Sequence, residues 1–263
     1  MRIDLTGKTA IVSGSGQGIG LAIAAGLAEA GAAVVVNARS VDRAAKAVDR
    51  VRGIVPGAEI RGVAADLSTP AGVQVLLDAE PRADILVNNL GIFEPKEFLD
   101  IPDADWQLMF DTNVMSSVRL SRAYLPAMLA TGTGRIVFVS SESALQIPPE
   151  MIHYGVTKIA QLALSRGLAE LCAGTGITVN SVLAGPTASE GVADFVNKLG
   201  GEGKPAQQAV DDFVREHRPT SILRRATSPE EVANMVVYLC SPQASATTGA
   251  AVSVDGGTRR SVI

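Results

Sequence analysis

Cysteine, aromatic residues and clustered positive charge are all scarce in this 263-residue chain, which has two cysteines and 4% aromatic residues. Two cysteines exclude a disulfide-stabilised scaffold, so Cys172 and Cys240 are expected to be free, buried thiols. The net charge of −4 is spread along the chain without a basic block, which argues against nucleic acid or an anionic membrane as a partner. The amino terminus lacks the apolar stretch of a signal peptide.

The stretch 18–36 has the length of a membrane span and contains one charged residue, Glu29. However, Gly31 and the β-branched run Val34-Val35-Val36 divide it into a helix, a turn and a strand. We therefore expect a cytoplasmic protein without a membrane partner.

Short β-branched runs alternate with helix-length amphipathic stretches along the chain. Strands this apolar, separated by helices, predict a parallel sheet covered on both faces. The length and the 47% apolar content suit one α/β domain over 1–263, a doubly wound, Rossmann-like sheet of about seven strands. The expected strands are Thr9–Val12, Ala33–Asn37, Ile60–Ala64, Ile85–Asn88, Arg135–Val139, Thr178–Val182 and Ala251–Val254.

The stretch 185–220 breaks this rhythm, being rich in glycine, alanine and charge. We expect it to form mobile helices outside the sheet that serve as a substrate lid; a plain surface insertion is the alternative.

A glycine-rich segment joins the first strand to the next helix, with Gly14, Gly18 and Gly20 in a G-x-x-x-G-x-G spacing. Glycines permit a tight turn and a close approach of the backbone to a ligand, and the helix amino terminus attracts a pyrophosphate. The segment therefore predicts a nucleotide site.

The end of the second strand reads Asn37-Ala38-Arg39-Ser40, with no acid to bind ribose hydroxyls. An arginine there accommodates a 2′-phosphate, so NADP(H) is preferred and NAD(H) remains possible. Alternatively, Arg39 only solvates the start of the next helix.

Tyr154 and Lys158 stand four residues apart on a predicted helix, which brings the phenol and the ammonium to one face. The positive charge is expected to lower the pKa of the phenol and so to create an acid–base group. Such pairs also occur by chance, but here a strand ends in Ser140-Ser141 just upstream.

Together these residues resemble the short-chain dehydrogenase/reductase family over almost the whole chain. The landmarks occur in order and at the family's spacing: the glycine loop, Asp66-Leu67, Asn88-Asn89-Leu90-Gly91, Asn113, Ser141, Tyr154, Lys158 and Val254-Asp255-Gly256-Gly257.

The resemblance implies a catalytic tetrad of Asn113, Ser141, Tyr154 and Lys158. Tyr154 would be the general acid for reduction and the base for oxidation. Lys158 would lower its pKa and bind the nicotinamide ribose, and Ser141 would hold the substrate oxygen. Asn113 would bind a water that connects the lysine to solvent.

Cofactor contacts are implied along the whole crevice, and no metal is expected. Asp66 would meet the adenine, Asn88 and Gly91 would line the adenosine side, and Thr187 and Ser189 would approach the carboxamide. The full expected set is Gly14, Ser15, Gln17, Gly18, Ile19, Gly20, Asn37, Arg39, Ser40, Asp66, Leu67, Asn88, Asn89, Gly91, Tyr154, Lys158, Gly185, Thr187 and Ser189.

Two residues beside the tetrad are open to opposite interpretations. Glu142 could meet a polar substrate, although a loop carboxylate is more often solvated. His153 adjoins Tyr154, but adjacent helix positions diverge, so we expect it to face the lid or solvent.

The expected function is NADP(H)-dependent interconversion of a ketone and a secondary alcohol, with a small-molecule substrate. Alternatives are an NAD-dependent dehydrogenase, an enoyl-type reductase or a non-catalytic NADP(H)-binding regulator. The close spacing of Tyr154 and Lys158 favours carbonyl chemistry, and the complete tetrad favours turnover. The resemblance also suggests a homodimer or homotetramer, formed partly by the Tyr154 helix through Gln161, Leu164, Ser165 and Leu168.

Overall fold

In the computed structural model, residues 2–190, 192 and 206–260 are described. Seven parallel strands form one sheet in the order β3-β2-β1-β4-β5-β6-β7, which confirms the predicted doubly wound fold. The strands are β1 (Thr9–Val12), β2 (Ala33–Ala38), β3 (Ile60–Ala64), β4 (Ile85–Asn88), β5 (Thr133–Ser141), β6 (Gly176–Ala184) and β7 (Ala251–Val254).

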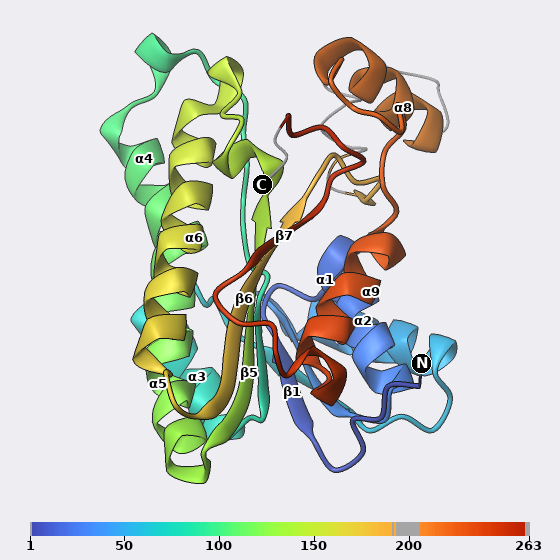
Figure 1. Cartoon of the computed structure of the whole chain (residues 1–263), viewed down its shortest axis with the longest axis vertical. Helices are drawn as coiled ribbons and strands as arrows, with labels where there is room; N and C mark the ends of the chain where they lie inside the picture. Colours follow the sequence, from blue (N-terminus) through green and yellow to red (C-terminus); the bar gives the residue numbers. More distant parts are fainter. Residues whose placement is uncertain (1, 191, 193–205, 261–263) are drawn as a thin grey trace.

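Helices cover both faces of the sheet: α1, α2 and α9 lie on one side and α3, α5 and α6 on the other (Figure 1). Each face has its own hydrophobic core, because neighbouring strand residues such as Ile11 and Val12 point into opposite cores. The α-helices are α1 (Gly18–Glu29), α2 (Val41–Ile54), α3 (Pro70–Ala79), α4 (Asp103–Met109), α5 (Ser116–Thr131), α6 (Ile152–Leu171), α8 (Ala206–His217) and α9 (Pro229–Cys240).

Shorter helical turns connect these elements, and one of them carries a predicted site residue. A π-helical stretch, Phe110–Met115, joins α4 to α5 and contains Asn113. Such π-helical turns are frequent at functional sites. The remaining turns are 3₁₀ helices at Phe98–Asp100, Glu142–Ala144, Pro149–Met151 and Pro242–Ala244.

The strand order reverses between β1 and β4, which opens a crevice at the carboxyl ends of the strands. Strands β5 and β6 pair in register from Thr133 with Gly176 to Ser141 with Ala184. This register brings Ser141 beside the segment that follows β6, and so beside the crevice.

The expected lid is described only in part, because residues 191 and 193–205 lie outside the described residues. Its described helix, α8, packs Val210 and Val214 against Ala226 in a small separate cluster. The role of the segment as a lid stays a prediction.

Two of the four residues expected on the self-association face of α6, Gln161 and Ser165, are not available at the surface. Gln161 and Ser165 are buried within the protein, where Gln161 Nε2 donates to Asn113 O at 2.7 Å, and Leu164 and Leu168 pack against the core. A polar side chain on a helix does not have to face solvent, because it can be buried when it finds a hydrogen-bond partner inside the protein. Assembly into a dimer or tetramer stays a prediction, which sedimentation can test.

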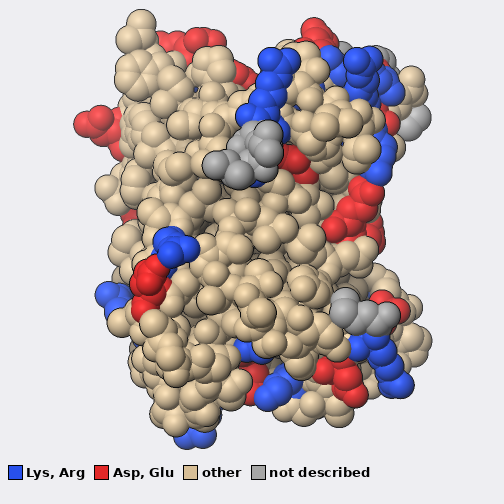
Figure 2. Space-filling view, in the orientation of Figure 1, with Lys and Arg blue, Asp and Glu red and all other residues tan. Residues whose placement is uncertain are grey.

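Charges on the surface are interspersed, and Figure 2 shows acidic and basic side chains around a largely uncharged face. Within residues 2–190, 192 and 206–260, none of the helices combines the length and the apolar character that crossing a bilayer requires.

Candidate active site

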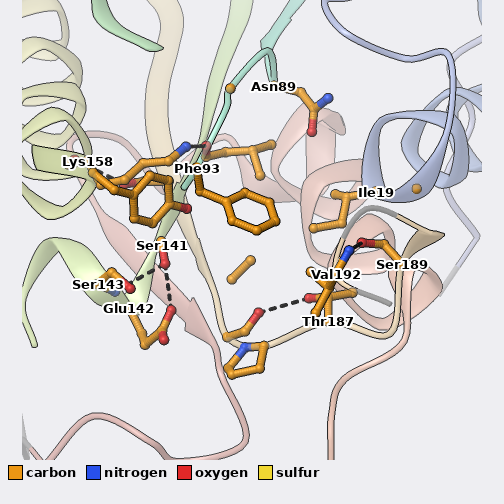
Figure 3. Close-up of a pocket in the computed structure, with 18 of the residues that line it drawn as sticks. Ile19, Asn89, Phe93, Ser141, Glu142, Ser143, Lys158, Thr187, Ser189 and Val192 are labelled. Atoms are coloured by element: carbon orange, nitrogen blue, oxygen red, sulfur yellow. Dashed lines mark hydrogen bonds between the residues drawn. The ribbon is translucent and has the colours of Figure 1, made fainter. Parts of the chain in front are cut away.

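A cavity of about 290 Å³ lies at the carboxyl ends of the central strands. It joins the glycine loop (residues 14–20) to the predicted catalytic groups, and Figure 3 shows side chains from both halves of the chain facing it. Its lining includes Gly14, Gln17, Gly18, Ile19, Gly20, Asn89, Leu90, Gly91, Ser141, Glu142, Tyr154, Lys158, Gly185, Thr187, Ser189 and Arg218.

The glycine loop takes a conformation that only glycine adopts without strain, with φ of +62° at Gly14 and +56° at Gly18. Two buried residues support it from below: Gly14 N donates to Asn37 Oδ1 at 3.1 Å, and Asn37 N donates to Ser15 Oγ at 2.8 Å. Ser15 and Asn37 therefore shape the loop, with their side chains bonded inside the protein.

The amino terminus of α1 already holds a negative group. Gly18 N donates to Glu190 Oε2 at 2.9 Å, and Arg50 Nη2 contacts the other carboxylate oxygen at 2.9 Å. The carboxylate stands in for a phosphate, because exposed N–H groups and the helix dipole attract anions there. A dinucleotide pyrophosphate thus fits this end of the cavity.

Because Glu190 competes for this position, Glu190→Gln should bind NADPH about two- to five-fold more tightly, the effect of one charge near a helix terminus. Isothermal titration measures the change. The matched control is Glu29→Gln, an equal loss of charge on an exposed residue at the far end of α1. Unchanged or weaker binding by the Glu190 variant would show that the carboxylate does not compete.

Three residues expected on the adenosine side, Arg39, Ser40 and Asp66, are exposed at the surface. Arg39 is exposed and, among the described residues, has no ion-pair partner, while Ser40 caps α2 by accepting from Arg43 N. Asp66 is exposed and accepts hydrogen bonds from Ser68.

Three further residues of the expected set lie beneath or beside the crevice. Leu67 is buried in the core, and Asn88 is buried with its amide donating to Ser121 Oγ at 3.2 Å. Asn89 lines the cavity and its amide binds the carbonyls of Ser13 and Gly14, which ties the two loops together.

The predicted pair of Tyr154 and Lys158 lies on one face of α6, with Lys158 Nζ 5.5 Å from the centroid of the Tyr154 ring. Lys158 Nζ donates to Val139 O at 3.1 Å, which anchors it to the end of β5. Ser141, at the same strand end, also lines the cavity and acts to lower the pKa of the Tyr154 phenol. Three of the four predicted catalytic groups therefore meet in the cavity.

The fourth, Asn113, is fully buried behind Lys158. Its amide binds Ile92 through both atoms, accepting from the backbone N–H at 2.8 Å and donating to the carbonyl at 2.9 Å, and donates to Thr157 Oγ1 at 3.0 Å. A Cβ on Gly91 would lie 3.4 Å from Lys158 Nζ, so glycine leaves space at this junction.

The pKa of Tyr154 is shifted in the direction opposite to the expected one. Burial raises the pKa of Tyr154 above its ordinary value and the nearby Glu142 carboxylate raises it further, against the lowering effects of Ser141 and Arg218. Burial also lowers the pKa of Lys158 to about 8. The expected lowering of the Tyr154 pKa is therefore wrong.

At the opposite wall, the segment after β6 brings three expected residues together. Gly185 N donates to Val254 O at 3.0 Å. Thr187 Oγ1 donates to Gly185 O at 2.9 Å (Figure 3). Ser189 Oγ accepts from Val192 N.

Sequence reasoning undervalued Glu142 and misplaced His153. Glu142 is buried in the cavity wall and pairs with Arg218, whose part in the site had no sequence signal. His153 is buried against Trp106, with ring centroids 5.8 Å apart, so its expected exposure is wrong.

Comparisons with known proteins identify the family of the chain. A family model described as enoyl-(acyl carrier protein) reductase matches residues 14–259. The chain is 48% identical to the uncharacterised oxidoreductase YvaG of Bacillus subtilis over the full length of both, and 32% identical to D-beta-hydroxybutyrate dehydrogenase of Rhizobium meliloti over 95% of this chain and 98% of that protein.

A solved structure of L-sorbose reductase from Gluconobacter frateurii, in complex with NADPH and L-sorbose, superposes with a TM-score of 0.91 at 35% identity, covering 100% of both chains. The fold and the site define an oxidoreductase of the doubly wound class. The chain belongs to the short-chain dehydrogenase/reductase family.

Proposed function

We propose that this protein is an NADP(H)-dependent oxidoreductase that interconverts a ketone and a secondary alcohol. The observation that carries the proposal is the convergence of Ser141, Tyr154 and Lys158 with the glycine loop in one cavity. A spectrophotometric assay of NADPH consumption over a panel of ketones tests it, and binding without turnover would favour the regulatory alternative.

Two observations support NADP(H) as the cofactor. The second strand ends without an acid and is followed by the exposed Arg39, and the L-sorbose reductase structure contains NADPH. The carboxylate of Glu190 at the α1 amino terminus supports binding of an anionic group there.

The residues of the cavity suit proton transfer to a carbonyl oxygen. When bound, the nicotinamide would supply a hydride for reduction or accept one for oxidation. The raised pKa of Tyr154 keeps its phenol neutral, so that it can donate the proton to the substrate oxygen. Lys158, as an ammonium, would stabilise the phenolate that remains.

An enoyl-type reductase is the second candidate, because the matching family model carries that description. The four-residue spacing of Tyr154 and Lys158 favours carbonyl chemistry instead. Parallel assays with a ketone and an enoyl thioester separate the two, and faster reduction of the thioester would reverse our choice.

The proposed role of Lys158 predicts the pH dependence of reduction. The pKa of this amine is lowered by burial to about 8, so its charge is present below that pH and is lost above it. We expect kcat/KM for reduction to fall as pH rises through about 8, because this parameter reports the free enzyme. In Lys158→Arg this decrease in kcat/KM should be absent up to pH ~10, because arginine keeps its charge. A wild-type profile that stays flat through pH ~9 would contradict the assignment.

A further inference from the structure

Glu142 and Arg218 form an ion pair in the wall of the cavity, although 76 residues separate them in sequence. Arg218 Nε lies 3.3 Å from Glu142 Oε1. Ser141 Oγ donates to Glu142 Oε2 at 2.5 Å (Figure 3). The two charged residues are 4% and 9% exposed. The carboxylate therefore lies directly beside the group expected to hold the substrate oxygen.

The positive charge of Arg218 is matched by carboxylates. Arg218 also lies 3.6 Å from Glu150 Oε1, so one guanidinium faces two carboxylates. Among the described residues that line the cavity, only Glu142, Lys158 and Arg218 carry charge, and Lys158 is held against Val139 O beside Tyr154. The substrate end of the cavity is thus poor in free positive charge.

We propose that the substrate is a neutral hydroxyketone, or the corresponding vicinal diol, whose extra hydroxyl group is bound by Glu142. The inference rests on the proposed function, since it assumes that the reacting oxygen sits between Ser141 and Tyr154. It adds the chemical class of the substrate and assigns Glu142 as the residue that selects it.

Geometry favours a hydroxyl on the carbon next to the carbonyl. Glu142 Oε2 is within hydrogen-bond distance of Ser141 Oγ. If Ser141 holds the carbonyl oxygen of the substrate, a hydroxyl on the adjacent carbon can therefore reach the carboxylate of Glu142. A carboxylate offers about four acceptor sites, and its two contacts here leave capacity for a hydroxyl. The acceptor is charged, which makes such a hydrogen bond stronger than a neutral one.

The substrate hydroxyl would also release Ser141. A serine hydroxyl has one proton to donate, and here it goes to Glu142. When a substrate hydroxyl donates to Glu142 in its place, the Ser141 proton becomes available to the substrate carbonyl. An unsubstituted ketone offers no such exchange. A ketone with a carboxylate in this position would meet the like charge of Glu142.

A series of four-carbon ketones tests the inference on the wild-type enzyme with NADPH. The members are butan-2-one, 1-hydroxybutan-2-one, 4-hydroxybutan-2-one and 2-oxobutanoate. We expect kcat/KM for 1-hydroxybutan-2-one to exceed that for butan-2-one by about ten-fold or more, the worth of a hydrogen bond to a charged group. The 4-hydroxy isomer should fall between them, and 2-oxobutanoate should be the poorest.

The variant Glu142→Gln separates charge from shape. Its preference for 1-hydroxybutan-2-one over butan-2-one should shrink by about five-fold or more, while 2-oxobutanoate improves because Arg218 loses one of its two carboxylate partners. The matched control is Glu150→Gln, which also faces Arg218 but does not line the cavity and should keep the wild-type order. Thermal unfolding and NADPH affinity report whether each variant is folded.

The outcomes distinguish this inference from the proposed function. Equal kcat/KM for butan-2-one and 1-hydroxybutan-2-one would leave the proposed function standing and overturn the role of Glu142. That role is overturned as well if 2-oxobutanoate is the best substrate of the wild type. If NADPH binds and none of the ketones is reduced, the proposed function fails, and the inference fails with it.

Discussion

Tyr154→Phe is expected to lower kcat for ketone reduction by about 10²–10⁴-fold, the usual contribution of a positioned acid–base group. The substitution deletes the proton that the substrate oxygen must receive. It leaves the ring in place, where it packs edge-on to Phe93 with centroids 6.1 Å apart. NADPH affinity should change by no more than about two-fold, because the phenol is assigned to the reacting oxygen.

Steady-state assays and a binding titration on the same preparations measure both quantities. The control is Tyr238→Phe, which removes a phenol oxygen from α9, outside the cavity lining. It should keep wild-type kcat. If Tyr154→Phe retains more than about a tenth of kcat, Tyr154 is not the acid.

The fold was readable from sequence because its determinants are local. The central strands, such as β2 and β4, are short runs rich in β-branched or aliphatic residues, and burial on both faces makes them almost continuously apolar rather than alternating. The start of α9 has a local determinant as well, since Ser228 and Glu231 form a capping box. Order and spacing then placed Ser141, Tyr154 and Lys158 at one end of the sheet.

The electrostatics of the site could not be read in the same way. The pKa of Tyr154 depends on burial and on Glu142, which lies on a different element, and these effects outweigh the expected influence of Lys158. The partner of Glu142 is Arg218, at the end of α8, and only the folded chain brings the two together. Sequence spacing carries information within one helix or turn, but not across such a distance.

The positions of several polar side chains were also predicted incorrectly, because their hydrogen-bond partners lie on other elements. Gln161 has the spacing of an outward-facing residue, yet its amide satisfies the carbonyl of Asn113 within the π-helical stretch. Asn37 and Ser15 belong to the expected cofactor set, and the structure shows them bonded beneath the glycine loop. A buried polar side chain needs a partner, and sequence alone does not tell which partner it finds.

Substitution of Arg39 is expected to have a large effect on the preference for NADPH over NADH. NADPH should bind more tightly than NADH, and Arg39→Ala should remove about ten- to 150-fold of the NADPH affinity, the worth of hydrogen bonds between a guanidinium and the 2′-phosphate. Arg39 is exposed at the end of β2 and, among the described residues, has no ion-pair partner, so no described carboxylate competes for it. The NADH affinity should stay nearly constant.

Ala38→Asp extends the test, because a carboxylate at the end of β2 repels the 2′-phosphate and accepts from the ribose hydroxyls of NADH. This variant should bind NADH more tightly than NADPH. Arg43→Ala is the matched control, since Arg43 is exposed one turn further along, in the first turn of α2. Dissociation constants of all four proteins for both cofactors are the measurement. If Arg39→Ala weakens the binding of NADPH and NADH equally, or if the wild type binds both with equal affinity, Arg39 does not recognise the 2′-phosphate. It would then be a surface charge that solvates the start of α2.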